Sequence, residues 1–251
     1  MTLPSAPVAG PAVVVPHVEL GLNPGETMAF DVKLAGIRAG EAQLAVGEIG
    51  TFEGHRAIVV HSRAETTGAA ALLKHLTDEA TTTIDADTGR PLQLDTVVEL
   101  DEKRTTATAK FTGSAADVTF ARDGEPAHSY RVQFGTTAAL DTHSAMAEIR
   151  SWKPAPGASR SVFVIGGRRL WRVDVHYVGD EQIGSVLGNR RAVRYDGSSF
   201  RVRPNLTPES DTPARTFSVW LSDDADRVPL KVIAHTELGD VAMDLTDYSR
   251  P

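Results

Sequence analysis

Cysteine is missing from this 251-residue sequence. Its absence excludes disulfides, thiolate nucleophiles and cysteine-based zinc or iron–sulfur sites, so the fold must be stabilised by packing alone. Long apolar runs are missing too. The best of them, Ala12 to Val15, is bounded by Pro11 and Pro16 and falls far short of the ~18 residues that a membrane-spanning helix needs. We therefore expect no transmembrane segment.

An excess of positive charge is also lacking. Lysine and arginine together number 26 against 33 aspartates and glutamates, which gives a net charge of −7. Such a chain has no global positive field to attract nucleic acid or anionic lipid, so we expect no nucleic-acid partner. Its length suits one large β domain or two small ones, either of which can bury a substantial core.

The sequence contains none of the motifs that fix a common catalytic mechanism. It has no Gly-x-Ser-x-Gly nucleophile elbow, no His-Glu-x-x-His zinc helix, no phosphate loop ending in Gly-Lys-Ser/Thr and no dinucleotide-binding glycine fingerprint. We therefore expect no enzymatic activity, and we assign no catalytic residue, no cofactor and no metal ligand.

Residues 1–24 differ in composition from the rest of the chain. They are rich in proline, alanine and valine and show no structural period, which predicts a flexible N-terminal lead. The first seven residues lack the basic and apolar regions of an intact signal peptide. Order is expected to begin at Pro24-Gly25-Glu26. Because there is no internal repeat and no later linker, residues 25–251 are predicted to form a single β-rich domain.

Apolar and polar residues alternate through most of that domain, which is the signature of strands with one buried face. The alternation is found at residues 28–34, 42–46, 58–60, 92–94, 130–134, 171–177, 217–221, 230–234 and 241–245. Turn residues separate these segments, and Gly166-Gly167 marks the clearest hairpin. The short spacing implies antiparallel hairpins. The predicted fold is mainly all-β: a single large, curved antiparallel sheet or open barrel, with one or two short covering helices.

Two segments favour those helices. Residues 69–76 place Leu72, Leu73 and Leu76 on one side, which suits a short helix that caps the sheet. Residues 137–150 form a longer amphipathic segment that stops before Pro154. A helix of this length can plug or cover a curved sheet.

Two polar clusters have the residue types of known sites without their pattern. Asp85 to Gly89 is similar to the start of a calcium loop but lacks its later acidic ligands, so a plain turn is favoured. Asp141, His143 and Ser144 include the types of a catalytic triad. Neighbours on one helix point in different directions, however, so capping and solvent exposure are the better interpretation.

Two further clusters lie toward the C-terminus. His235 and Glu237 share one face of a strand, where a metal pair is geometrically possible, but without a third ligand a solvent-facing position is favoured. Asp223, Asp224 and Asp226 crowd a short loop, where mutual repulsion raises a carboxylate pKa or attracts a cation. A solvated hairpin turn is the preferred interpretation.

Several short stretches carry a resemblance to a known family. They are Pro24-Gly25-Glu26 leading into Phe30-Asp31-Val32, Gly36-Ile37-Arg38-Ala39-Gly40-Glu41-Ala42, Asp141-Thr142-His143-Ser144-Ala145 running to Ile149-Arg150, Val178-Gly179-Asp180-Glu181, and Trp220-Leu221-Ser222-Asp223-Asp224 with Arg227-Val228-Pro229. In order and spacing the chain resembles the bacterial exported-protein family catalogued as domain of unknown function number 3108. The resemblance implies a β-rich periplasmic or outer-membrane-associated protein of Gram-negative type, with no established activity.

Five residues in these stretches are candidates for ligand binding or for a structural motif: Trp220, Asp223, Asp224, Arg150 and Glu181. Trp220 is a large aromatic on the polar side of its strand, so it needs cover from a helix, a neighbouring strand or a ligand. The helix at residues 137–150 is the favoured cover. Arg150 is expected to pair with Asp223 or Asp224 and lock the helix end onto the hairpin.

Three functions are compatible with this pattern. The first is a carrier or binding protein of the cell envelope whose concave face holds a lipid-like ligand. The second is a non-catalytic structural or interaction protein whose edges meet an envelope partner. The third is an enzyme that uses carboxylates such as Glu181 with Asp223 and Asp224. Neither a ligand nor an oligomeric state is specified by the residues.

Overall fold

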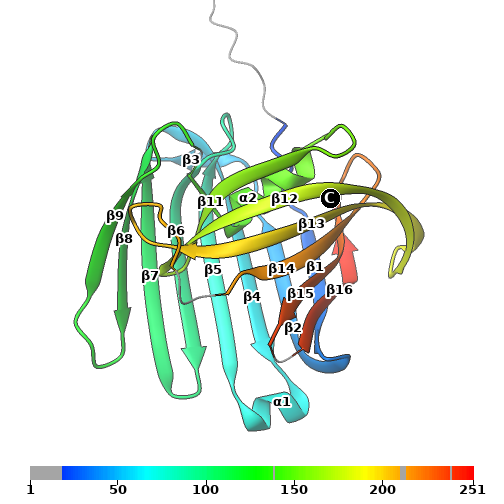
Figure 1. The fold of residues 1–251 in the computed structure, drawn as a ribbon, viewed down its shortest axis with the longest axis horizontal. Coiled ribbons are helices and arrows are strands. Elements are labelled where there is room, and N and C mark those ends of the chain that lie inside the picture. The colour runs from blue at the N-terminus through cyan, green and yellow to red at the C-terminus, as the bar shows by residue number, and fades with distance from the viewer. Residues whose placement is uncertain (1–18, 138, 210–212, 238) are drawn as a thin grey trace, which may run out of the picture.

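The structure is a computed structural model that describes residues 19–137, 139–209, 213–237 and 239–251. Within these residues sixteen strands form one sheet, and two helices accompany it (Figure 1). The strands are β1 Thr27–Leu34, β2 Ile37–Val46, β3 Gly50–Phe52, β4 His55–Thr66, β5 Leu76–Asp85, β6 Pro91–Leu100, β7 Lys103–Thr112, β8 Ala115–Arg122, β9 His128–Gln133, β10 Ala139–Asp141, β11 Ser159–Gly166, β12 Arg169–Ser185, β13 Gly188–Val202, β14 Arg215–Ser222, β15 Pro229–Thr236 and β16 Gly239–Ser249. The helices are α1 Gly68–Leu73 and α2 Thr142–Ser151.

The strands lie in the order β10-β11-β12-β13-β14-β15-β16-β1-β2-β4-β5-β6-β7-β8-β9, with β3 paired to β4. Neighbours are antiparallel except β10 and β11, which pair in parallel over three residues. A parallel pair needs a crossover connection, and α2 supplies it. The predicted all-β, open and curved antiparallel sheet is confirmed.

The sequence pattern located most of these strands but missed β3, β5, β7, β8, β10 and β13. In β7 the buried positions are Ala107 and Ala109, and in β5 they include Thr82 and Thr83. Small and hydroxylated side chains give little contrast with the opposite face, so the period of two is hard to detect there.

Helix α2 begins at Thr142, later than the predicted Thr137, because Asp141 caps it. The Asp141 carboxylate accepts hydrogen bonds from the backbone N–H of His143 at 3.1 Å and of Ser144 at 3.0 Å. The Ser144 hydroxyl in turn accepts from the backbone N–H of Asp141 at 2.9 Å. This reciprocal capping box fixes the first turn. Residues Ala139–Asp141, which were predicted to be helical, form strand β10 instead.

Helix α1 does not cap the sheet as predicted. It ends at Leu73, and none of its residues is buried. Leu72 and Leu73 are each 89% exposed, whereas Leu76 begins strand β5. The three leucines therefore form no common packed face. The short helix is a solvent-exposed connection between β4 and β5 (Figure 1).

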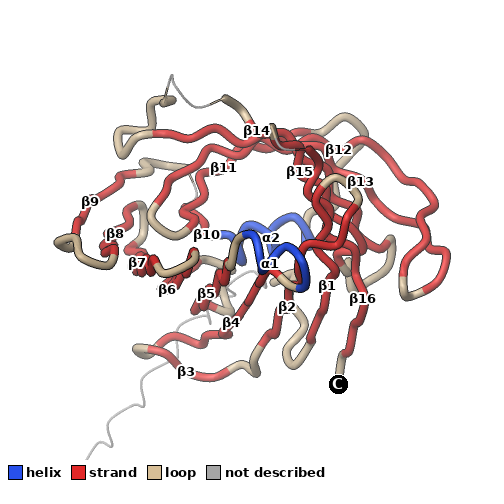
Figure 2. The backbone as a smooth tube through the Cα atoms, turned by 90° about the horizontal axis from the view of Figure 1, so that it is seen from below, coloured by secondary structure: helices blue, strands red, loops and turns tan. Residues whose placement is uncertain are grey.

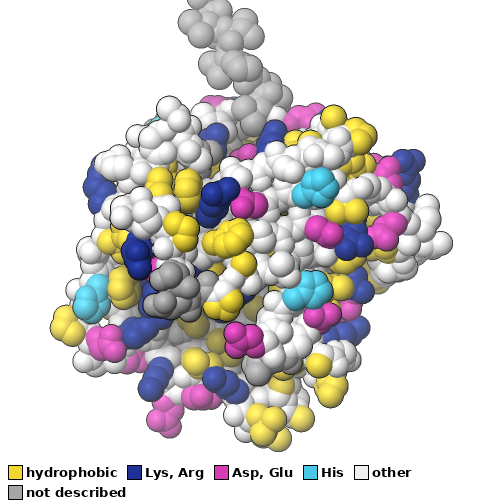
Figure 3. All heavy atoms as spheres, viewed as in Figure 1, with side chains coloured by type: hydrophobic (Ala, Val, Ile, Leu, Met, Phe, Trp, Pro, Cys, Tyr) yellow, Lys and Arg dark blue, Asp and Glu magenta, His cyan; other side chains and the backbone are white. Residues whose placement is uncertain are grey.

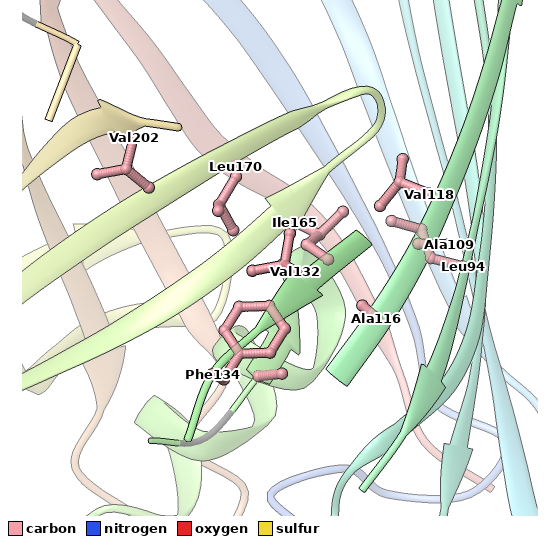
Figure 4. Packing of buried hydrophobic residues seen from close by; sticks show 10 residues of the cluster. Leu94, Ala109, Ala116, Val118, Val132, Phe134, Ile165, Leu170 and Val202 are labelled. Carbon is pink, nitrogen blue, oxygen red and sulfur yellow. The ribbon is translucent and has the colours of Figure 1, made fainter. Parts of the chain in front are cut away.

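The curved sheet wraps around α2, which lies on its inner side (Figure 2). No ladder of backbone hydrogen bonds joins β10 to β9 within the described part of the chain. Instead, apolar side chains of β10 to β13 pack on those of β6 to β9 (Figure 4). Ile165 and Leu170 on one side meet Leu94, Val118 and Val132 on the other. The sheet therefore overlaps itself through side chains and remains open.

The end of the predicted lead that can be described is packed against α2. Leu20 and Leu22 join a cluster with Met146 and Ala147, and Leu22 is 7% exposed. Residues 1–18, which make up the rest of the lead, lie outside the described residues. Within the described chain, neither helix has the length and apolar character needed to cross a bilayer.

Candidate functional site

The inner side of the sheet holds a cavity of about 520 Å³ between α2 and the strands. Most of the side chains that line this inner cavity are apolar, and the polar ones are Gln43, Ser62, Arg63, Asp78, Thr142 and His143. Its wall includes Phe30, Ala42, Leu44, Ala64, Ala80, Ala145, Met146, Ile149, Val164, Val173, Phe217, Val219, Leu221, Val232 and Met243. A volume of this size falls within the range of small-molecule sites.

The alternation of the strands explains this wall. In β14, Phe217, Val219 and Leu221 line the inner cavity, while Trp220 between them lies on the opposite face. Helix α2 contributes Met146 and Ile149, three residues apart and therefore on one side of the helix. The apolar side of this predicted amphipathic segment thus covers the concave side of the sheet.

One polar chain of hydrogen bonds interrupts the apolar wall. His143 lies between Ser62 of β4, at 2.8 Å from Nε2, and Thr82 of β5, at 2.7 Å from Nδ1. The Thr82 hydroxyl donates its proton to the Asp141 carboxylate. Thr82 therefore accepts from Nδ1–H, and in a neutral ring Nε2 accepts from the Ser62 hydroxyl. This arrangement ties the start of α2 to two neighbouring strands.

The surroundings of His143 favour a neutral imidazole. Burial lowers the pKa of His143, the nearby charge of His61 adds to the effect, and the Asp141 carboxylate opposes it. Neither nitrogen of a neutral ring is left unsatisfied by these two hydroxyl partners. In the described residues no group of three or more His, Asp or Glu side chains is arranged to hold a metal ion.

A second, outer cavity of about 800 Å³ adjoins the first, because Asp78, Ala80 and Thr142 line both. Asp78 lines both cavities and is exposed to solvent. The surrounding protein nevertheless raises the pKa of Asp78 by desolvation. A carboxyl group thus stands at the junction of an apolar chamber and a wider, more polar one.

Arg150, a predicted site residue, is almost completely buried at 2% exposure. Its guanidinium pairs with Glu26, with Nη1–Oε1 at 2.5 Å and Nη2–Oε2 at 2.9 Å. It also donates to the backbone carbonyls of Asp226 at 2.8 Å and Arg227 at 3.1 Å. The predicted link to the β14–β15 loop exists, but Glu26 is the acidic partner and not Asp223 or Asp224.

Trp220 lies on the outer side of the sheet, at 8% exposure, and not in the cavity wall. The indole N–H donates to Glu181, and the Arg194 guanidinium lies 5.1 Å from the ring centre. Ile183 and Leu187 of the β12–β13 hairpin pack against the same cluster. The cover is therefore a neighbouring pair of strands, and the predicted cover by α2 is wrong.

Asp223 and Asp224 stabilise the β14–β15 loop. The Asp223 carboxylate is 3.1 Å from Arg191 Nε. Asp224 accepts from the Ser222 hydroxyl at 2.7 Å and from the backbone N–H groups of Asp226 and Arg227. The five predicted residues therefore fall into two groups. Arg150, Asp223 and Asp224 meet at the β14–β15 loop, whereas Glu181 and Trp220 contact each other on the outer side of the sheet.

Sequence reasoning missed the residues at the cavity. Ser62 and His143 are 81 positions apart, and Asp78 lies in β5, a strand that the pattern did not reveal. The one available signal was the triad-like composition of Asp141, His143 and Ser144. The structure joins His143 to Ser62 across the sheet and uses Ser144 for the helix cap. The predicted capping role is therefore confirmed, whereas the predicted solvent exposure is wrong, because Asp141, His143 and Ser144 are all buried.

The two remaining polar clusters, at Asp85 to Gly89 and at His235, lie in or beside turns. Asp85 closes a turn by accepting from the backbone N–H of Asp87 at 3.0 Å and of Thr88 at 2.8 Å. His235 pairs with Asp240 at 2.7 Å across the β15–β16 hairpin. On one face of the molecule, charged side chains of both signs are interspersed with polar and apolar ones (Figure 3).

These features define a class: mainly-β proteins in which one open, strongly curved sheet wraps around a helix and an apolar cavity. The sequence belongs to the family described as "Protein of unknown function (DUF3108)", whose profile matches residues 29–246. The resemblance drawn from the short sequence stretches is thereby confirmed. No curated protein matches the chain significantly.

Three solved structures align with most of this chain at low sequence identity, and the first of them shares its fold. A β-barrel-like protein of domain of unknown function DUF1849 from Brucella abortus superposes with a TM-score of 0.60 at 11% identity, over 91% of this chain and 98% of that one. A candidate exported protein with a YmcC-like fold from Bacteroides fragilis gives 0.39 at 8% identity, over 91% and 97%. A candidate lipoprotein from Parabacteroides distasonis gives 0.38 at 8%, over 90% and 96%.

Proposed function

We propose that this protein is a binding or carrier protein of the bacterial cell envelope for an apolar or amphipathic, lipid-like ligand. The observation that carries the proposal is the inner cavity of about 520 Å³. Its wall presents aliphatic and aromatic side chains from strands across the sheet and from α2, with few polar groups. Such a wall favours a guest that gains from leaving water, because burial of apolar surface is the main driving force there.

The proposed location follows from the sequence stretches that resemble exported proteins. A lipid-like molecule needs a protein to shield it between the membranes of an envelope, and a cavity covered on one side by a helix supports such a role. No step of this function requires a reaction, so we propose a non-catalytic role. The acidic residues considered for catalysis are engaged elsewhere: Asp223 with Arg191, and Glu181 with Trp220.

The alternative is a structural or interaction protein with a filled interior. A packed interior would leave no chamber between α2 and the sheet, since protein cores are filled to near crystal density. The inner cavity favours the carrier over this alternative. The exposed strand edges and loops remain available to partners in either case.

The test is the uptake of a fluorescent fatty acid by delipidated protein, with native mass spectrometry to detect bound ligand. The variant Ala64→Trp places a bulky ring into the cavity wall, whereas Val59→Trp places it on the outer face of the same strand. Val59 is 43% exposed. We expect Ala64→Trp to weaken uptake roughly ten-fold or more, with Val59→Trp close to the unmodified protein.

Absence of saturable uptake and of any bound ligand in the unmodified protein would overturn the proposal. Equal uptake by both tryptophan variants would show that a different surface binds the fatty acid. Thermal unfolding followed by circular dichroism controls for loss of the fold in either variant.

A further inference from the structure

The side chains that line the outer cavity indicate how a ligand is oriented in the protein. Four cationic side chains, Lys103, Arg104, Arg122 and Arg168, line it together with the carboxylates of Asp78, Asp123 and Glu125. Its wall therefore carries more positive than negative groups, on a protein whose net charge is −7. The inner cavity, by contrast, has a mainly apolar wall, in which Arg63, paired with Glu65 and Glu79, and Asp78 are the charged side chains. The two joined chambers thus differ sharply in chemistry.

Arg122 and Arg168 line this outer cavity, and two more arginines lie close to them outside its lining. Arg168 lies in the β11–β12 turn beside Arg169, with Arg122 at the end of β8 and Arg201 at the end of β13. Burial, aided by the positive charges of its three neighbours, lowers the pKa of Arg168. Burial, aided by the charges of Arg201 and Arg122, also lowers the pKa of Arg169. Bringing four guanidinium groups together is unfavourable unless an anion offsets their repulsion.

The described carboxylates neutralise only part of this cluster. Glu125 lies 3.8 Å from Arg122, and Glu209 lies 3.4 Å from Arg201. Arg168 and Arg169 have no ion pair with any described carboxylate. In addition, Arg201 Nε is buried without a hydrogen-bond partner among the described residues. Guanidinium groups with unused donors are suited to bind carboxylate or phosphate oxygens.

Asp78 favours one orientation of such a ligand. It stands where the outer cavity meets the inner one, and its carboxylate would repel an anionic group that moved further inward. A negatively charged head group is therefore most favourable beside Arg122 and Arg168, on the outer side of Asp78. An attached hydrocarbon tail can then pass into the apolar chamber.

We propose that the outer cavity binds the anionic head group, a carboxylate or phosphate, of an amphiphile whose tail occupies the inner cavity. This inference rests on the proposed carrier function and specifies its ligand class: a single-tailed or similar amphiphile with a negative head. The arginines select the charge of the head group, and the inner wall selects the tail.

The experiment compares laurate with dodecanol, which share a chain length and differ in charge, by displacement of a neutral fluorophore from the full-length protein. We expect laurate to bind roughly ten-fold more tightly at low salt, with the preference shrinking as salt screens the charges. The variant Arg122→Gln/Arg168→Gln should reduce the preference to about one while leaving dodecanol affinity unchanged. The control Arg131→Gln/Arg172→Gln removes two exposed arginines that the cavities do not include, and it should keep the preference.

Each other result has a definite meaning. If both ligands bind with equal affinity, the head-group site is disproved while the carrier function stands. If neither binds, both proposals fall. A third arm uses inorganic phosphate: saturable binding that depends on Arg122 and Arg168, without a laurate preference, would show a free-anion site and overturn the head-group assignment. Should the double variant unfold, the single variants Arg122→Gln and Arg168→Gln are each expected to lose part of the preference.

Discussion

Arg150 connects three parts of the chain that are distant in sequence. It extends from the last turn of α2 to Glu26, just before β1, and to two carbonyl groups in the β14–β15 loop. Both charged side chains are nearly inaccessible to solvent, at 1% and 0%. In such a setting the loss of one partner is far more costly than the pair is stabilising, because the remaining charge stays buried.

We therefore expect Glu26→Gln to lower the free energy of unfolding by about 3 kcal/mol. The matched control is Glu19→Gln, which alters an acid that pairs with Lys153 where both side chains are 67% exposed. That change should cost less than about 1 kcal/mol. Urea unfolding of both variants measures the difference, and equal effects would show that the buried pair is not the stronger determinant.

His143 makes stability depend on pH. Its folded-state pKa is lowered by burial, so below about pH 6.5 the unfolded chain binds a proton that the folded chain does not. The free energy of unfolding is then fully maintained above pH 6.5. It falls as the pH drops below that value, by up to about 1.4 kcal/mol per pH unit.

Thermal melts between pH 7.5 and 5.5 test this expectation. The substitution His143→Gln replaces the titrating imidazole with an amide that can still form hydrogen bonds. We expect it to reduce the loss of stability at low pH. The matched control is His128→Gln on the exposed surface of β9, which should leave the fall in place. An unchanged profile in His143→Gln would mean that other groups cause the acid sensitivity. The lowered pKa values of Asp85, Asp180 and Asp196 affect the free energy of unfolding only at more acidic pH.

Among the strands, β2 contains a glycine with a clear steric role. A Cβ at Gly40 would lie 2.2 Å from the backbone carbonyl oxygen of Glu65 in β4. The glycine lies beside a register shift in the pairing of β1 with β2, between Val32 and Lys33. The close approach of two backbones at this irregular point excludes a side chain. This gives a physical reason for one glycine of the family-like stretch from Gly36 to Ala42.

The variant Gly40→Ala should therefore lower the free energy of unfolding by about 2 kcal/mol, since the contacting atom is backbone and cannot swing away. Gly184→Ala in β12 is the matched control, because nothing lies within 4 Å of a Cβ built there. That change should be neutral or slightly stabilising. If chemical denaturation gives the two alanines the same sign and size, the steric explanation fails.

The elements also show what sequence patterns could and could not reveal. Strands with large apolar residues on one face, such as β1 and β14, were predicted correctly. Strands such as β7 were missed, because Ala107 and Ala109 occupy their buried positions. The α2 boundary was displaced because the Asp141 cap decides the start of the helix. The α1 leucines were misassigned, since an apolar stripe alone does not specify a partner surface.

For the molecule as a whole, the curved open sheet followed from the regular strand spacing, but the site did not. The inner cavity needs contacts between residues far apart in the chain, such as Ser62 with His143, and no local period encodes such contacts. The overlap of β10–β13 with β6–β9 is equally non-local. Conversely, the predicted site residues gathered at the β14–β15 loop and the outer Trp220 cluster, where their contacts hold the fold together.

That overlap has a mechanical consequence. In a fully closed barrel, the number of strands and their stagger determine the diameter. Here no ladder of backbone hydrogen bonds joins the β9 and β10 ends of the described sheet. They meet through the apolar cluster around Ile165 and Leu170 and through a hydrogen bond from the Tyr130 hydroxyl to the backbone carbonyl of Arg168 at 3.4 Å. We therefore expect the circumference to be less strictly fixed than in a closed barrel, within the limit set by the hydrogen bonds that tie Asp141 and His143 to Thr82 and Ser62.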